Sequence, residues 1–191
     1  MTRTTGLSLD LAIESLPLAK PFRISGHVFT EAPVVIVTLS DGIHIGRGEA
    51  AGVYYRGDDV PAMTAAIEGV RAAVGAGVTR GALQNLLPAG GARHAIDCAL
   101  WELSARRSDT PVHELADLPA PRPLRTTFTL GADDPEVMAE GARDFAQARA
   151  LKLKLTGDLD LDIARVDAVR EARPDCWIGV DANQGFAIGE L

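Results

Sequence analysis

Aromatic residues are scarce in this sequence, making up 5% of its 191 residues. The core must therefore rest on aliphatic side chains, since hydrophobic residues in total account for 47% of the chain and charged residues for 24%. This composition is typical of a soluble globular protein. The length of the chain suits one ordinary domain or two small ones. Cysteine is also rare: Cys98 and Cys176 form no CxxC pair, and we expect two buried, reduced thiols.

Long apolar runs and basic clusters are missing as well. No stretch approaches the ~18 apolar residues that indicate a transmembrane helix, and the polar start carries no signal-peptide core. The formal net charge is −7, whereas nucleic-acid binding needs a clustered positive surface. We therefore expect a cytoplasmic protein with neither a membrane nor a nucleic acid as partner.

The first part of the chain predicts strands followed by helices. Alternating apolar residues over 7–13 predict a half-buried strand, and the pattern over 34–45 predicts a hairpin with a turn at 40–42. Helical spacing then predicts one helix over 63–74, capped by Asp59, and a second from about Ala92 to Arg107. Three prolines between 119 and 123 cannot continue a helix or a central strand. We interpret them as a linker between domains at 1–118 and 124–191.

The second part alternates strands and helices. Strands are expected at 126–130, 151–155 and 177–181, with helices after Asp134-Pro135 and after Asp158. This order indicates a parallel sheet with right-handed crossovers, either open and doubly wound or closed into a barrel. One stripe of the first helix is expected at Met138, Ala142, Phe145 and Arg149, with Phe145 as its anchor. The apolar face of the second helix is expected at Leu159, Ile163, Val166 and Val169.

Two lysines stand in the middle strand of this second part. Side chains alternate across a strand, so Lys152 and Lys154 share one face. Two neighbouring ammonium groups disfavour each other's charge, and a lysine made less basic in this way can act as a general base. Two solvated lysines on an amphipathic strand explain the spacing equally well.

An acidic residue ends the next strand. Asp181 follows an apolar run, and a carboxylate at the end of such a strand suits a hard cation such as Mg²⁺. Alternatively, Asp181-Ala182-Asn183 is a turn in which the aspartate accepts hydrogen bonds from nearby backbone.

Together, a Lys-x-Lys strand followed by an acid at the end of the next strand resembles the enolase superfamily, in the subgroup of muconate-lactonising enzymes and dipeptide epimerases. Residues 87–103 are similar to the helix that ends the family's capping domain, and residues 46–50 to the strand that leads to its mobile capping loop. The resemblance covers essentially all 191 residues. It implies an α+β capping domain and then the first three βα units of a TIM-like (β/α) barrel, truncated at Leu191.

The resemblance also implies roles for site residues. Asp181 would be the first of three Mg²⁺ ligands, Lys154 the base on one face of the substrate, and Lys152 an electrostatic aid near the substrate carboxylate. The other ligands and a second acid/base would come from later strands. The substrate-binding residues would be Arg23, Tyr54, Tyr55, Arg56, Thr127 and Asn183, with Thr129 beside them. For Arg23 a plain surface position is an equal alternative, and the two tyrosines could simply pack their loop down.

The expected function is that of an isomerase. We expect Mg²⁺-dependent epimerisation of an L-Ala-D/L-Glu-type dipeptide through an enediolate, by a homo-oligomer that binds a dipeptide or N-acyl amino acid. Other enzyme candidates are an N-acylamino-acid racemase, an o-succinylbenzoate synthase and a muconate cycloisomerase. A candidate of another class is an inactive truncated fragment that binds little Mg²⁺.

Overall fold

The chain folds into two compact units. The computed structural model describes residues 6–190, apart from the side chains of Tyr54 and Glu190. One unit comprises Met1–Leu16 and Ala32–Pro121, and the other comprises Pro17–Glu31 and Arg122–Leu191. The division at Pro121 lies inside the stretch that we interpret as a linker. The grouping of residues 17–31 with the second unit was not predicted from the sequence.

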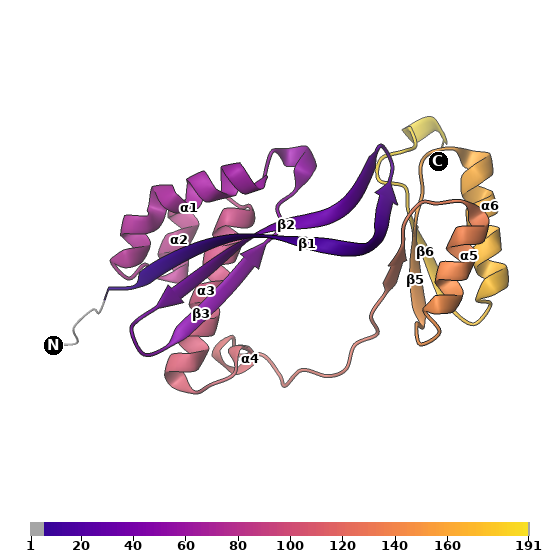
Figure 1. Ribbon diagram of the computed structural model, residues 1–191. Coiled ribbons are helices and arrows are strands. Elements are labelled where there is room, and N and C mark those ends of the chain that lie inside the picture. Colours follow the sequence, from indigo (N-terminus) through magenta and orange to yellow (C-terminus); the bar gives the residue numbers. More distant parts are fainter. Residues whose placement is uncertain (1–5, 191) are drawn as a thin grey trace. The chain divides into compact units, whose positions relative to one another are not determined.

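A three-stranded sheet of order β1-β2-β3 is formed by β1 (Ser8–Ile24), β2 (His27–Ser40) and β3 (Ile45–Ala50) (Figure 1). Residues 8–16 and 32–50 of this sheet belong to the first unit, and residues 17–31 belong to the second. Strands β2 and β3 are antiparallel, which confirms the predicted hairpin over 34–45. Strand β1 is much longer than the predicted 7–13. Its residues 12–21 are all exposed, including Ile13, which we expected in a half-buried strand, so no buried face marks this part of β1.

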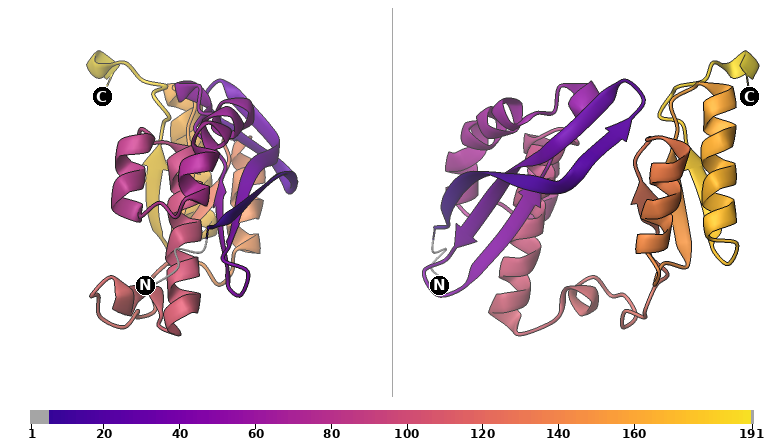
Figure 2. Two further views of the ribbon diagram at one scale, coloured as in Figure 1. Left: turned by 90° about the vertical axis from the view of Figure 1, so that its left-hand side faces the viewer. Right: turned by 45° about the vertical axis from the view of Figure 1, so that its right-hand side comes forward.

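The helices of the first unit are α1 (Val60–Gly75), α2 (Arg80–Leu86), α3 (Gly91–Ser108) and α4 (Val112–Leu115), and a 3₁₀ turn covers Tyr54–Arg56. Helices α1, α2 and α3 lie on one face of the sheet (Figures 1 and 2), and α4 contacts the end of α3. Asp59 caps α1 as predicted, since its side chain accepts a hydrogen bond from the Ala62 N–H. Helices α2 and α4 were not predicted, because each is too short to show a helical period.

Two glycines let α3 pack closely on β3. A Cβ atom added at Gly46 would lie 2.1 Å from the Ala99 carbonyl oxygen, and one added at Gly48 would lie 1.9 Å from that of Ala95. Only a residue without a side chain fits at either position. The contact buries Val35, Val37 and Leu39 of β2 in one core with Ile67, Ala95, Ile96, Ala99 and Leu103.

The second unit is a parallel βαβαβ arrangement. Its elements are β4 (Phe128–Leu130), α5 (Pro135–Asp144), β5 (Ala150–Lys154), α6 (Leu159–Ala172) and β6 (Trp177–Asp181), followed by a 3₁₀ turn at Ile188–Glu190. The strand order is β4-β5-β6, and both pairings are parallel, as predicted. Helices α5 and α6 cover one face (Figure 1), where Leu151, Leu153 and Leu155 pack with Met138, Ala142 and Val169.

Several side-chain placements correct the sequence-based expectations. Leu159 and Ile163 are 57% and 51% exposed, so they do not belong to the buried face of α6. That face instead carries Asp162 and Arg165, which are buried as a hydrogen-bonded pair. Arg149 lies beyond the end of α5. Cys176 is buried as expected, whereas Cys98 is only partly buried.

Across the described residues 6–190, no helix is both long and apolar enough to cross a membrane.

Candidate functional site

The two lysines of β5 project from the sheet face opposite the helices. Lys154 is 8% exposed, and the side chain of Lys152 is 40% exposed. The parallel register of β5 and β6 places Lys154 directly opposite Asp181, while Thr129 of β4 lies opposite Lys152. Because the three strands are parallel, the ends that bear Lys154 and Asp181 meet at one edge of the sheet.

Asp181 accepts hydrogen bonds on both carboxylate oxygens. Its Oδ2 lies 2.8 Å from Lys154 Nζ and 3.3 Å from Lys152 Nζ, and its Oδ1 accepts the Asn183 N–H at 3.0 Å. The hydrogen bond from Lys154 is the main reason that the pKa of Asp181 falls from 3.8 to about 2, with smaller contributions from Asn183 and Lys152. Asp181 therefore stays a carboxylate throughout the neutral range.

Asn183 completes this polar cluster. Its Oδ1 accepts a second hydrogen bond from Lys154 Nζ at 2.8 Å. Asn183 and Gln184 both adopt left-handed backbone conformations, with φ values of 47° and 65°. This turn brings the Asn183 side chain back onto the lysine. Asp181 therefore makes the predicted Asp-x-Asn turn and also faces the lysines, while its role as a metal ligand stays a prediction.

A divalent cation would find only part of a site here. Asp181 is a carboxylate at a strand end, where a hard cation binds well, and Asn183 adds an amide oxygen. Within residues 6–190, however, no three His, Cys, Asp or Glu side chains are grouped so that they could hold a metal ion. Asp181 thus fits one ligand position, and the described residues do not fill the others.

The comparison with known proteins decides the family. Residues 8–116 match the N-terminal domain of the mandelate racemase / muconate lactonizing enzyme family. The chain belongs to this family, which is part of the enolase superfamily.

Relatives of this enolase-superfamily chain include dipeptide epimerases. The L-Ala-D/L-Glu epimerase of Escherichia coli K12 is 38% identical over 173 residues, which are 91% of this chain and 54% of that protein. An enolase family member from Agrobacterium tumefaciens, described as having homology to dipeptide epimerases, superposes with a TM-score of 0.90 at 37% identity, covering 97% of this chain and 56% of that one.

A dipeptide epimerase from Methylococcus capsulatus, solved with Mg and the dipeptide L-Arg-D-Lys, gives a TM-score of 0.87 at 28% identity, covering 97% and 56% of the two chains. The chain thus spans about half the length of the relatives that it matches.

The predicted substrate-binding residues of the second unit lie at several places in that unit. Asn183 contacts Lys154 and so belongs to the polar cluster, and Thr129 lies on the neighbouring strand opposite Lys152. Thr127 was expected in the strand, but it lies just before β4 and is exposed. Arg23 lies near the end of β1, with its Nε 3.6 Å from Asp133 Oδ2, and about half of its side chain is exposed.

The remaining predicted residues belong to the capping loop of the first unit. Tyr55 and Arg56 lie in the 3₁₀ turn and are exposed, with the Arg56 guanidinium 5.9 Å from the centre of the Tyr55 ring. The side chain of Tyr54 lies outside the described part of the structure. A role for these residues in a substrate pocket stays a prediction.

The sequence analysis missed a buried pair beside the site. Asp162 and Arg165 of α6 are 2% and 5% exposed and contact the loop that follows β5. Opposite charges three residues apart on a helix are usually a surface pair, so their burial was not expected from the sequence. Their helical spacing could have revealed them, because Asp162 and Arg165 lie on the same face of the helix as Val166 and Val169.

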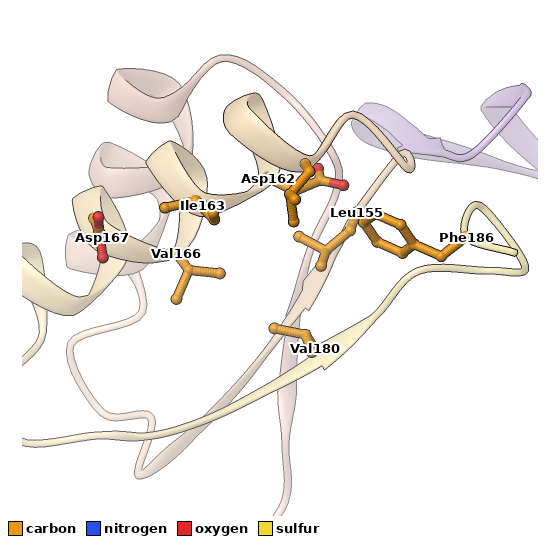
Figure 3. A pocket seen from close by; sticks show the side chains of 8 residues that line it. Leu155, Asp162, Ile163, Val166, Asp167, Val180 and Phe186 are labelled. Atoms are coloured by element: carbon orange, nitrogen blue, oxygen red, sulfur yellow. The ribbon is translucent and has the colours of Figure 1, made fainter. Parts of the chain in front are cut away.

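An apolar groove of about 460 Å³ runs between α6 and β6. Figure 3 shows Ile163 and Val166 of α6 facing Val180 of β6, with Leu155 and Phe186 at one end. The exposure of Leu159 and Ile163 follows from their position along this groove.

Proposed function

We propose that the protein is a Mg²⁺-dependent dipeptide epimerase, an isomerase that inverts the carbon next to the C-terminal carboxylate of a dipeptide. The observation that carries this proposal is the contact of Lys154 with Asp181 at 2.8 Å, with Lys152 at 3.3 Å on the same oxygen. It joins a candidate base to a candidate metal ligand at the end of parallel strands, where barrel enzymes hold their active sites.

Lys154 is held in a fixed position, as a general base must be to reach the substrate proton. It is almost fully buried, and its Nζ is held between Asp181 and Asn183, so its position is fixed. In its neutral form this Nζ takes the α-proton of the substrate. Lys152 is more exposed, and in this proposal its side chain attracts the substrate carboxylate. We place the second acid, which returns a proton to the opposite face, outside residues 6–190.

Asp181 would hold Mg²⁺ in the proposed enzyme, together with ligands from outside the described residues. A bound Mg²⁺ would supply positive charge where the substrate carboxylate gains negative charge on becoming an enediolate. Asn183 keeps the Asp181 carboxylate oriented through its backbone N–H. Removing this hydrogen bond would leave the carboxylate free to rotate about its side-chain torsions.

The test is exchange of the substrate α-proton with solvent. The intact protein is incubated with L-Ala-L-Glu and Mg²⁺ in D₂O, and deuterium at the glutamate α-carbon is followed by NMR. We expect exchange by the wild type and a loss of about 10²–10⁴-fold in Lys154→Met, the range for removal of a general base. Lys20→Met is the matched control, because Lys20 is an exposed lysine paired with Asp144.

Two results would refute the assignment. One is an absence of exchange with every dipeptide offered, and the other is a Lys154→Met variant as fast as Lys20→Met. A wild type that exchanges N-acyl amino acids but no dipeptide would favour the racemase alternative. Turnover of a cycloisomerase or o-succinylbenzoate synthase substrate without dipeptide exchange would favour those reactions.

A non-catalytic chain is the second candidate function. It is supported by the single carboxylate at the site, which both lysines already engage, and by the lack of any group of three metal-binding side chains within residues 6–190. Calorimetric titration of the 191-residue chain with Mg²⁺ separates the two candidates. Weak, non-saturating binding agrees with the second candidate, whereas tight saturable binding that is lost in Asp181→Asn excludes it.

A further inference from the structure

The buried ion pair of α6 is unusually well connected. Arg165 Nη1 lies 2.7 Å from Asp162 Oδ1, and both residues are at least 95% buried. Taking two charges out of water is costly, and apolar replacements of such pairs are often as stable or more so. A pair of this kind is therefore weak evidence for stability, and its hydrogen-bond partners show better what it does.

All of those partners are in loops at the carboxyl ends of strands. The Asp162 carboxylate accepts the backbone N–H groups of Thr156 at 3.1 Å and Gly157 at 2.9 Å, directly after β5. Arg165 donates from Nη1 to Thr156 Oγ1 at 2.8 Å. Its Nε donates to the carbonyl oxygen of Asp133 at 2.7 Å, in the loop after β4. One helical pair thus ties two neighbouring loops together.

The third loop is reached through a close glycine contact. Gly157 has a φ of +94°, and a Cβ atom there would lie 2.0 Å from the carbonyl oxygen of Gly185. Gly185 follows Asp181 and Asn183, so the loop that Asp162 holds is packed directly on the loop of the polar cluster. The loop that the buried pair holds therefore contacts the loop that follows Asp181 and Asn183.

We propose that Asp162 and Arg165 are positioning residues for the active site, which hold the loops after β4, β5 and β6 so that Lys154 stays in register with Asp181. This inference rests on the proposed function. Their effect on the reaction is indirect, since neither residue contacts Lys154 or Asp181 in the hydrogen bonds described above. A displacement of about 1 Å between reacting groups can reduce a rate by ~10²-fold, which makes such support valuable.

The test compares Asp162→Asn with Asp160→Asn in the intact protein. Asp160 is exposed two residues earlier on the same helix, so the control removes the same charge without touching the loops. Asp162→Asn keeps the size of the side chain and weakens its hold on Thr156 and Gly157. Thr156→Val is a milder second variant, which removes only the hydroxyl that Arg165 binds, in case Asp162→Asn does not fold.

Two readouts do not depend on catalysis. The first is hydrogen–deuterium exchange at the Thr156 and Gly157 amides. The second is the rate at which acetic anhydride labels Lys154, measured by mass spectrometry against the exposed Lys20 as internal reference. In Asp162→Asn we expect both rates to rise by about tenfold, since the loop opens more often. Asp160→Asn should match the wild type.

The catalytic readout separates positioning from stability. With L-Ala-L-Glu and saturating Mg²⁺, we expect Asp162→Asn to lower kcat by about tenfold or more while KM changes by less than about threefold. Thr156→Val should also lower kcat, but by a smaller factor than Asp162→Asn does. The proposal is overturned if kcat and the labelling of Lys154 stay within about twofold of wild type while only the stability to urea falls.

Failure of the proposed function would look different. If the wild type exchanges no substrate, the epimerase assignment is wrong, and the amide exchange and Lys154 labelling alone decide the role of the pair. Faster labelling of Lys154 in Asp162→Asn at an unchanged Lys20 rate would still support it. Unchanged labelling of Lys154 would refute it.

Discussion

Lys154 Nζ lies 2.8 Å from Asp181 Oδ2, so the candidate base and the candidate metal ligand are ion-paired across two neighbouring parallel strands. Each group influences the other. The carboxylate holds Lys154 Nζ in place, and the hydrogen bond from Lys154 lowers the pKa of the Asp181 carboxyl group.

We expect Lys154→Met to raise the pKa of Asp181 from about 2 toward its usual value of 3.8, because the lysine hydrogen bond is the main cause of the shift. Carboxyl ¹³C NMR titration measures this, with Asp181→Asn to assign the signal. A lowered pKa in the folded state means that the pairing stabilises the fold above pH 3.8 and that this stabilisation is lost as the pH falls toward 2. A pKa near 3.8 for Asp181 in the wild type would contradict its hydrogen bond with Lys154.

Arg23 gives a prediction about substrate choice. If its guanidinium binds the side-chain carboxylate of the substrate, Arg23→Met should raise KM about tenfold or more for L-Ala-L-Glu, the loss of a charge-assisted hydrogen bond. KM for L-Ala-L-Leu should change by less than about twofold. If Arg23 serves only its ion pair with Asp133, both dipeptides should respond alike. Lys20→Met, in the same strand, is the control.

The packing of α3 on β3 predicts a large effect of one methyl group. Gly48→Ala places a Cβ atom 1.9 Å from the Ala95 carbonyl oxygen, so the helix must move. We expect a loss of about 3 kcal/mol in the free energy of unfolding, measured in urea. Gly69→Ala in α1 meets nothing within 4 Å and should instead add up to about 1 kcal/mol. Equal effects of the two substitutions would disprove the close approach.

Asp41 makes the stability of the first unit depend on pH. Its carboxylate accepts the His44 N–H at 2.7 Å, Arg107 Nε at 2.6 Å and the Ile43 N–H at 2.9 Å. These contacts, with the His44 N–H first, hold the pKa of Asp41 well below its usual value of 3.8. The folded state therefore gains stability from Asp41 above pH 3.8 and loses it as the pH falls below that value.

We accordingly expect Asp41→Asn to destabilise the protein at pH 7 and to differ less from the wild type as the pH falls below 3.8. Urea unfolding at a series of pH values measures the difference. Asp109→Asn, at the exposed end of α3, is the control, since it removes the same charge and asparagine tolerates the left-handed backbone there. A difference between Asp41→Asn and wild type that persists at low pH would argue against the ionised carboxylate as its source.

Much of the fold could be predicted from local patterns. The hairpin over 34–45, the helix α1 with its Asp59 cap and the strand at 177–181 all follow from periods and capping residues that neighbours in the sequence determine. The long β1 and the short α2 and α4 could not, because exposed strands and short helices leave no period to detect. The stripe of α6 was misjudged because charged residues occupy part of its buried face.

The sequence by itself determined where the candidate residues lie on their strands: alternation put Lys152 and Lys154 on one face of β5, and the apolar run before Asp181 put that residue at the end of β6. Only the tertiary structure decided how far apart they lie, because the distance between residues 27 positions apart depends on strand register, which local pattern does not specify. The same reason hid Asp162 and Arg165. Burying these two charges costs little free energy only after folding supplies hydrogen-bond partners, which are the amides and carbonyl groups of loops after distant strands.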